Sequence, residues 1–125
     1  MLDPKITEAF RIMWGNFPEP VMLVRKDRTV LATNKYAQRI GIAAGIKCHS
    51  LNPETGTADH CQRCQANAAL RTGEAVCTQE QMGETPVRGY WVPVTDSPDI
   101  FVHFGIGTAD AMTAAQAGSG ACGEA

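Results

Sequence analysis

Residues 17–41 read FPEPVMLVRKDRTVLATNKYAQRIG, and the order of residue types in this stretch predicts a hairpin followed by a helix. The two prolines at its start exclude a helix and favour an extended lead-in. Two short apolar segments, 21–25 and 29–33, flank a polar turn and therefore predict a pair of strands. Asn34 is a good N-cap for a short helix that ends near Gly41.

The segment before this hairpin predicts an amphipathic helix over residues 2–14. Asp3 and Pro4 suit the first positions of a helix, and Gly15 suits its end. Apolar residues recur at helical spacing and give the helix one apolar face: Leu2, Ile6, Ala9, Phe10, Met13 and Trp14.

The chain after the hairpin predicts helical segments first and strands afterwards. The expected elements are a helical turn at 48–51, a helix from His60 to Thr72 capped by Asp59 and ended by Gly73, strands at 75–82, 86–95 and 100–108, and a turn at 96–99. Strands that pair locally indicate an antiparallel sheet. The expected fold class is therefore α+β, with a five-stranded antiparallel sheet and helices packed on one face.

The composition fits one globular domain and excludes several kinds of partner. The chain has 125 residues, of which 44% are hydrophobic and 19% are charged. A net charge of −2 gives no electrostatic reason to expect nucleic acid or an anionic membrane as a partner. The N-terminus has acidic residues early and does not follow the secretory pattern, so a cytoplasmic location is expected.

Three stretches together resemble PAS domains, the sensory modules of many signalling proteins. They are the opening stretch 17–41, the helix-to-strand junction LRTGEAV at 70–76, and the closing stretch GYWVPVTDSPDIFVHFGIGTAD at 89–110. The resemblance covers about residues 2–108. The expected organisation is an N-terminal helix at 1–16, a PAS core at 17–108 and a C-terminal tail at 109–125, and the Gly-, Ala- and Ser-rich sequence of this tail predicts that it is flexible.

The PAS resemblance also implies how such a module works. The concave face of the sheet and its flanking helices would enclose a ligand or cofactor, and binding there would shift the sheet and the terminal helices. A homodimer through the N-terminal helix is expected, with Leu2, Ile6, Phe10 and Met13 at the contact; alternatively this helix only covers its own sheet. The sequence 107–110, Gly-Thr-Ala-Asp, stands where the family often has an Asp-Ile-Thr signature that couples to an effector. No effector segment is recognisable in this chain, so the signalling partner is expected elsewhere.

Four cysteines, Cys48, Cys61, Cys64 and Cys77, lie in one window of the sequence. Cys61 and Cys64 form a C-x-x-C pair that the helix predicted from residue 60 would place on one face of its first turn, where thiolates are favoured. Four thiolates suit zinc or an iron–sulfur cluster. In a variant of this site, His60 or His49 replaces Cys77. Strand alternation sets Cys77 opposite to its two neighbours, and either set can face the site.

Other readings of the thiols remain open. They can form a redox dithiol–disulfide pair, or they can be packing residues, since cysteine is often buried. Cys48 stands where flavin-binding PAS domains have their reactive cysteine, but His49 and Asn52 stand where those domains have Arg and Gln. A haem would need a histidine such as His60. Flavin and haem are therefore disfavoured as cofactors.

The sequence predicts a sensory module that reads redox state, oxygen or metal through its cysteines. The alternative is a module that binds a small molecule or a protein and has structural cysteines. A thiol oxidoreductase using Cys61 and Cys64 is a third hypothesis, disfavoured because the pair does not follow a strand as in thioredoxin-like units. No paired carboxylates, phosphate loop or catalytic triad is recognisable, so no enzymatic activity is expected.

Overall fold

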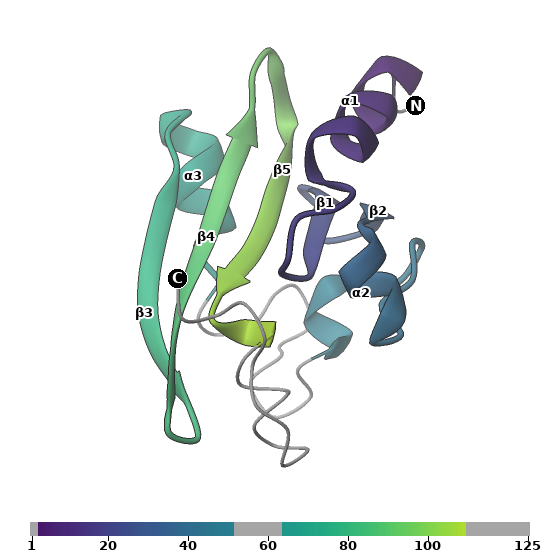
Figure 1. The fold of residues 1–125 in the computed structure, drawn as a ribbon. Helices are drawn as coiled ribbons and strands as arrows, with labels where there is room; N and C mark the ends of the chain where they lie inside the picture. The colour runs from purple at the N-terminus through teal and green to yellow at the C-terminus, as the bar shows by residue number, and fades with distance from the viewer. Residues whose placement is uncertain (1–2, 52–63, 110–125) are drawn as a thin grey trace.

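The computed structural model describes residues 3–51 and 64–109, and a five-stranded sheet forms its centre (Figure 1). Its helices and strands are, in chain order, α1 Pro4–Trp14, β1 Val21–Arg25, β2 Val30–Thr33, α2 Lys35–Arg39, a 3₁₀ helix Cys48–Leu51, α3 Ala66–Thr72, β3 Val76–Met82, β4 Thr85–Val94 and β5 Ser97–Ile106. In the described residues, none of the helices has the length and apolar character that a membrane span requires.

The strands lie in the order β2-β1-β5-β4-β3, and all neighbouring strands are antiparallel. Strand β1 pairs with β2 on one edge and with β5 on the other, where Leu23 lies opposite Val102. The first and last strands therefore join the opening hairpin to the closing one, as the PAS resemblance implies. The α+β class and the five-stranded antiparallel sheet are confirmed.

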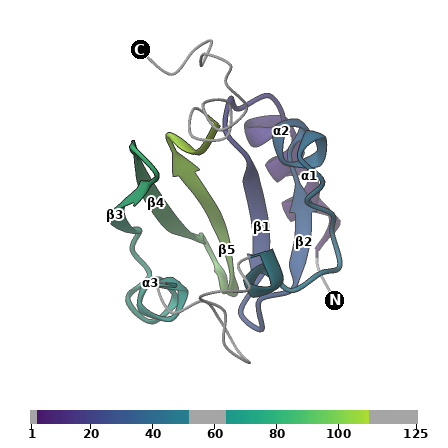
Figure 2. The same cartoon turned by 90° about the horizontal axis from the view of Figure 1, so that it is seen from below.

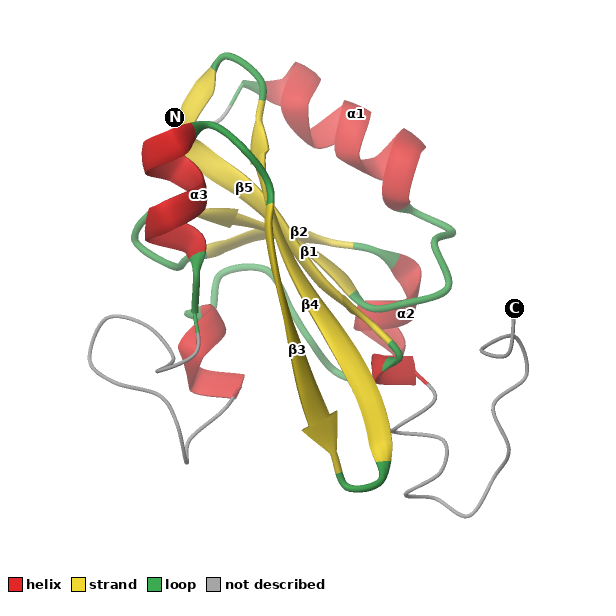
Figure 3. Ribbon diagram, turned by 90° about the vertical axis from the view of Figure 1, so that its left-hand side faces the viewer, coloured by secondary structure: helices red, strands yellow, loops and turns green. Residues whose placement is uncertain are grey.

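The two faces of the sheet carry separate apolar clusters, and strand alternation sorts the residues between them. We call the first the back cluster, formed by Phe10, Val21, Leu23 and Val102. We call the second the front cluster, formed by Met22, Val24, Val30, Ala66, Ala69, Trp91 and Phe101. Helix α1 supplies Phe10 to the back cluster and α3 supplies Ala66 and Ala69 to the front cluster, so these helices lie on opposite sides of the sheet (Figure 3).

The sequence predicts that all helices pack on one face of the sheet. Helix α1 departs from this prediction, because it packs on the face opposite to α3. Its apolar residues Ile6 and Phe10 pack against the back cluster. A sheet that is apolar on both faces needs a cover on each, so α1 occupies the face that the later helices leave open. Helix α2 lies beside the end of α1, where the Lys35 N–H donates to the Gly15 carbonyl at 3.2 Å (Figure 2).

The capping residues expected from the sequence are confirmed at both early helices. The Asp3 carboxylate accepts a hydrogen bond from the Lys5 N–H at 2.9 Å and begins α1. The Asn34 side chain accepts from the Ala37 N–H at 3.0 Å and begins α2.

Helix α3 begins at Ala66, which is later than expected, and Cys64 lies before it. Its first residue and Ala69 are both fully buried against the sheet. Tertiary packing of short helices outweighs local propensity, so the position of these two alanines determines where the described helix lies. Gly73 ends the helix in the left-handed conformation at φ 73°, as expected.

The turn between β4 and β5 is tighter than the sequence indicated. The strands meet at Val94 and Ser97, and the turn residue Asp96 adopts φ 60°. Pro98 therefore lies within β5 and not in a turn. The register shifts after Pro93, which is opposite Phe101, so Pro98 falls in an irregular part of the pairing where its missing N–H is tolerated.

Candidate functional site

Of the three predicted cysteine ligands that the structure describes, two contact the front of the sheet. Cys48, at the start of the 3₁₀ helix, and Cys64, just before α3, both pack against the front cluster and are partly buried. The Cys48 N–H donates to the Arg28 carbonyl at 2.8 Å, which fixes the 3₁₀ helix to the turn between β1 and β2. The structure thus places these two thiols against one apolar cluster.

Cys77 lies on the other side of the sheet. It is exposed, and its neighbour Val76 packs against the front cluster, so strand alternation directs the two side chains to opposite faces. Its register partner Tyr90 stacks on Phe104, with ring centroids 5.1 Å apart, and Phe104 packs against the back cluster. The structure does not bring Cys77 together with Cys48 and Cys64.

Of the three remaining predicted ligands, the structure describes one. Cys61 and His60 lie outside the described residues, whereas His49 is partly buried on the 3₁₀ helix. The described part of the chain contains no group of three His, Cys, Asp or Glu residues able to hold a metal ion. Cys64 precedes α3, so it does not lie in the first turn of this helix as the sequence predicts.

Arg28 is a residue of this face that the sequence did not single out. It lies in the turn between β1 and β2 with φ 74°, and only 3% of its surface is exposed. Its Nη1 donates to the Lys26 carbonyl, its Nη2 donates to Asn67 Oδ1 at 3.2 Å, and its Nε has no hydrogen-bond partner among the described residues. The guanidinium carbon lies 5.8 Å from the ring centroid of Phe101. From the sequence alone, a charged residue in a polar turn is expected to be exposed to solvent, so the sequence does not indicate that Arg28 is buried.

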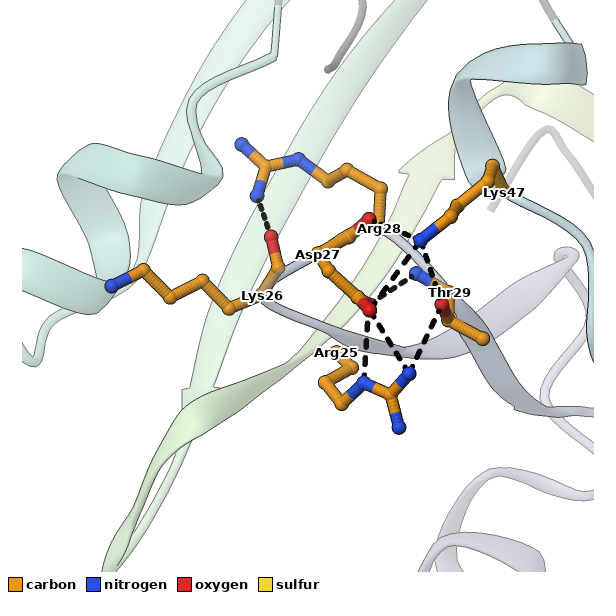
Figure 4. A network of polar contacts seen from close by, with 6 residues as sticks. All are labelled: Arg25, Lys26, Asp27, Arg28, Thr29 and Lys47. Carbon is orange, nitrogen blue, oxygen red and sulfur yellow. Dashed lines mark hydrogen bonds and ion pairs between the residues drawn. The ribbon is translucent and has the colours of Figure 1, made fainter. Parts of the chain in front are cut away.

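The neighbouring carboxylate, Asp27, forms its contacts with other residues (Figure 4). It accepts from Arg25 Nε at 3.1 Å and Nη2 at 2.9 Å, and it lies 3.4 Å from Lys47 Nζ. These contacts, chiefly the Arg25 hydrogen bond, hold the pKa of Asp27 far below its usual value. The Arg28 guanidinium extends away from this network (Figure 4).

His103 on β5 contributes a titratable ring to the front side. Its ring stacks on Trp91 with centroids 4.7 Å apart, and its Nδ1 donates to the Tyr90 carbonyl at 2.9 Å. Burial lowers the pKa of His103 from its ordinary value of 6.5, since a buried imidazole resists protonation. The hydrogen bond to Tyr90 opposes this effect and also fixes the proton on Nδ1.

Glu19 is a second residue that the sequence did not single out, and it lies where the chain leaves β5. Its buried carboxylate accepts from the Gly107 N–H at 2.9 Å and from the Ala109 N–H at 2.8 Å. Gly107 has φ 101°, and a Cβ there would lie 2.5 Å from the Pro86 carbonyl oxygen, so only glycine fits. Glu19 therefore connects the lead-in to β1 with the segment in which PAS domains often carry their coupling signature.

Comparisons with known proteins identify the fold. The chain matches no model of a known family and no curated protein sequence. It superimposes on a sensory box sensor histidine kinase from Vibrio cholerae with a TM-score of 0.58 and 15% identity, over 81% of this chain and 87% of that one. It also superimposes on a domain of an HTR-like protein from Haloarcula marismortui with a TM-score of 0.54 and 21% identity, over 70% of this chain and 95% of that one.

These likenesses define a class of fold. The sheet order is that of sensory box domains, also called PAS domains. The two structural matches are to proteins with domains of this fold. The chain therefore has a PAS-like fold, as its sequence implied.

Proposed function

We propose that this chain is a sensory module of PAS type that detects a chemical signal on the front of its sheet. The fold, shared with the sensory box structures, is the observation that carries this proposal. The front side supports it with chemically active groups on an apolar surface, since Cys48 of the 3₁₀ helix, Cys64 before α3 and His103 of β5 come from three separate segments. Within this proposal the module itself is non-catalytic and acts on a separate effector, and its compartment is the cytoplasm.

The signal proposed first is redox state, oxygen or a metal, read by thiols. The described residues offer two thiols on the front side, which is fewer than the three protein ligands that zinc sites use as a minimum. Cys61 would be the third ligand, and His49 or His60 could complete a tetrahedral set. Cys77 faces the other side, so we propose a site of three thiolates in place of the four first expected.

Purification without oxygen, followed by elemental analysis and an absorption spectrum, tests this proposal. The wild-type chain should retain zinc, or iron with sulfide, and Cys48→Ser, Cys61→Ser and Cys64→Ser should each lose it. Cys77→Ser is the matched control and should retain the metal. If the single substitution Cys77→Ser abolishes metal binding, the three-thiolate site is contradicted.

A small-molecule or protein-binding module with structural thiols is the second candidate, favoured by the buried and incompletely bonded Arg28. Wild-type protein that holds neither metal nor chromophore, and whose four cysteine variants keep full ligand response, would support this candidate. A thiol oxidoreductase is the third, and it requires a reversible disulfide between Cys61 and Cys64.

Homodimerisation through α1 also belongs to this proposal, with a changed contact face. Ile6 and Phe10 pack against the back cluster, whereas Ile12 and Met13 are 65% and 75% exposed. A dimer through α1 would therefore use Ile12 and Met13. Size-exclusion chromatography with light scattering should find a monomer for Ile12→Glu/Met13→Glu and a dimer for wild type. The control Ile40→Glu changes an exposed apolar residue outside α1 and should remain dimeric.

A further inference from the structure

The position of Arg28 combines three unfavourable features. Its φ of 74° lies in a region that residues other than glycine rarely adopt. Its side chain is removed from water, with 3% of the residue exposed, although a guanidinium remains charged in proteins. Its Nε is buried and has no hydrogen-bond partner in the part of the chain that the structure describes. Each feature destabilises the folded chain, and such combinations concentrate at binding sites.

No described carboxylate balances this charge. Both acceptors of Arg28, the Lys26 carbonyl and the Asn67 amide oxygen, are neutral. The nearest acid in sequence, Asp27, forms ion pairs with Arg25 and Lys47. A buried guanidinium held only by neutral acceptors is incompletely stabilised, because buried charges are normally paired with a counter-charge.

The geometry of the guanidinium indicates which chemical group could supply its missing acceptor and counter-charge. The Nε–H and one Nη2–H of an arginine lie on the same edge of the guanidinium, and a carboxylate or phosphate accepts from both in parallel. Within residues 3–51 and 64–109, Nε on this edge of Arg28 has no acceptor and Nη2 has only Asn67 Oδ1 at 3.2 Å. Asn67 is exposed on α3, so an incoming anion can displace a neutral side chain at the surface.

We propose that Arg28 binds the carboxylate or phosphate group of a small molecule through Nε and Nη2, beside Asn67 of α3. This inference rests on the proposed sensory function and names the class of ligand that the front side takes. The anion supplies the missing counter-charge and the missing acceptor together. Because the Arg28 carbonyl holds the Cys48 N–H and its guanidinium lies over Phe101, binding acts directly on the front cluster.

Thermal unfolding of the dialysed, metal-free chain tests the proposal with defined probes. Sodium acetate, succinate and phosphate are each compared with sodium chloride at equal ionic strength. At least one of the three oxyanions should raise the wild-type Tm by about 3 °C or more at saturation. A response to acetate and succinate assigns a carboxylate ligand, and a response to phosphate alone assigns a phosphate ligand.

Arg28→Met removes the charge and the donors but keeps an unbranched apolar stem over Phe101. This variant should lose the response to oxyanions while it unfolds at a Tm close to or above that of wild type in chloride, because it buries no unbalanced charge. If Arg28→Met lowers the Tm in chloride and the wild-type Tm does not respond to any oxyanion, Arg28 has a structural role.

Asn67→Asp provides an independent arm that does not depend on the folding of Arg28→Met. It places a carboxylate where the ligand is proposed to bind, so it should raise the Tm in chloride and reduce the oxyanion response. Aspartate near a helix N-terminus also stabilises by itself. The same substitution in the Arg28→Met background measures that separate effect, and the difference between the two backgrounds isolates the pair.

The outcomes separate this inference from the function on which it rests. A wild-type Tm that responds to none of the three oxyanions overturns anion binding, whether or not the cysteines retain metal. An oxyanion response that is equal in wild type and Arg28→Met overturns the role of Arg28. An Arg28-dependent response in a chain that holds no metal supports the inference and favours the small-molecule module over the thiol sensor.

Discussion

Asn34 joins more segments than any other described side chain in the hydrogen bonds of this fold. Its Oδ1 accepts from the N–H groups of Val21 and Ala37, and its Nδ2 donates to the carbonyls of Trp14, Phe17 and Glu19. One buried amide thereby connects the end of α1, the lead-in, β1 and α2. The sequence predicted its capping role from its type and position, but the bonds to the distant lead-in depend on the tertiary fold.

Two substitutions at Asn34 should therefore differ in their effects. Asn34→Ala should lower the free energy of unfolding by about 2–4 kcal/mol, because it leaves buried N–H and C=O groups without partners. Asn34→Ser keeps an oxygen able to cap α2 and should recover about 1 kcal/mol of that loss. Urea unfolding measures both values. Equal destabilisation by the two substitutions would contradict a separate capping contribution.

His103 should make stability depend on pH. Its pKa is lowered in the folded chain, so as pH falls below about 6.5 the unfolded chain takes up a proton before the folded chain does. The free energy of unfolding should therefore decrease as pH falls from 6.5 toward the folded pKa, and this contribution should be constant above that range. His103→Asn keeps a donor for the Tyr90 carbonyl but does not titrate. Urea unfolding from pH 7.5 to 5.5 should show a steeper decrease for wild type than for His103→Asn, and parallel curves would contradict the buried neutral imidazole.

At the scale of elements, the segment that follows β5 is bound by the carboxylate of Glu19, which lies in the lead-in to β1. Glu19→Gln keeps the size of the side chain but replaces one acceptor oxygen with a donor, which cannot bond to an N–H. The variant should lose about 1–3 kcal/mol of stability. Amide hydrogen exchange at Gly107 and Ala109 should accelerate. Glu74→Gln is the matched control, since Glu74 is exposed, and it should change neither measurement.

Sequence reasoning succeeded where an element depends on its own residues. Asp3, Asn34 and Gly73 were assigned as helix ends because capping is a local interaction, and the structure places them there. The start of α3 was wrong because the burial of Ala66 and Ala69 depends on contacts with the sheet. The turn before β5 was misplaced because the sequence does not show where the strand pairing becomes irregular around Pro98.

The candidate site follows the same division. The sequence singled out the thiols by spacing and left the direction of Cys77 open, and that direction follows from the face to which Val76 packs. Arg28 and Glu19 have no local signature, because one acquires its importance from burial and the other from two distant N–H groups. Groups of this kind are recognised only when the neighbours that enclose them are known.

At the scale of the whole molecule, the sheet separates two chemical environments. The front carries Cys48, Cys64 and Arg28, whereas the back carries the exposed Cys77 beside Tyr90. Helix α1 covers the back, and Glu19 holds the chain where it leaves β5. Changes on the front can reach the back through the strands that contribute residues to both clusters, such as β1 and β5.

This separation predicts how the thiols react in the native chain. Labelling with N-ethylmaleimide, followed by mass spectrometry of the peptides, should modify Cys77 about tenfold or more faster than Cys48 and Cys64, because the reagent needs an accessible thiolate. Added zinc should slow the labelling of Cys48 and Cys64 and leave Cys77 unchanged, since the sheet lies between them. Unfolding in urea should bring the three rates together, which controls for differences in intrinsic reactivity. Zinc protection that includes Cys77 would require its thiol to reach the front of the sheet, and the register of Cys77 with Tyr90 would then be wrong.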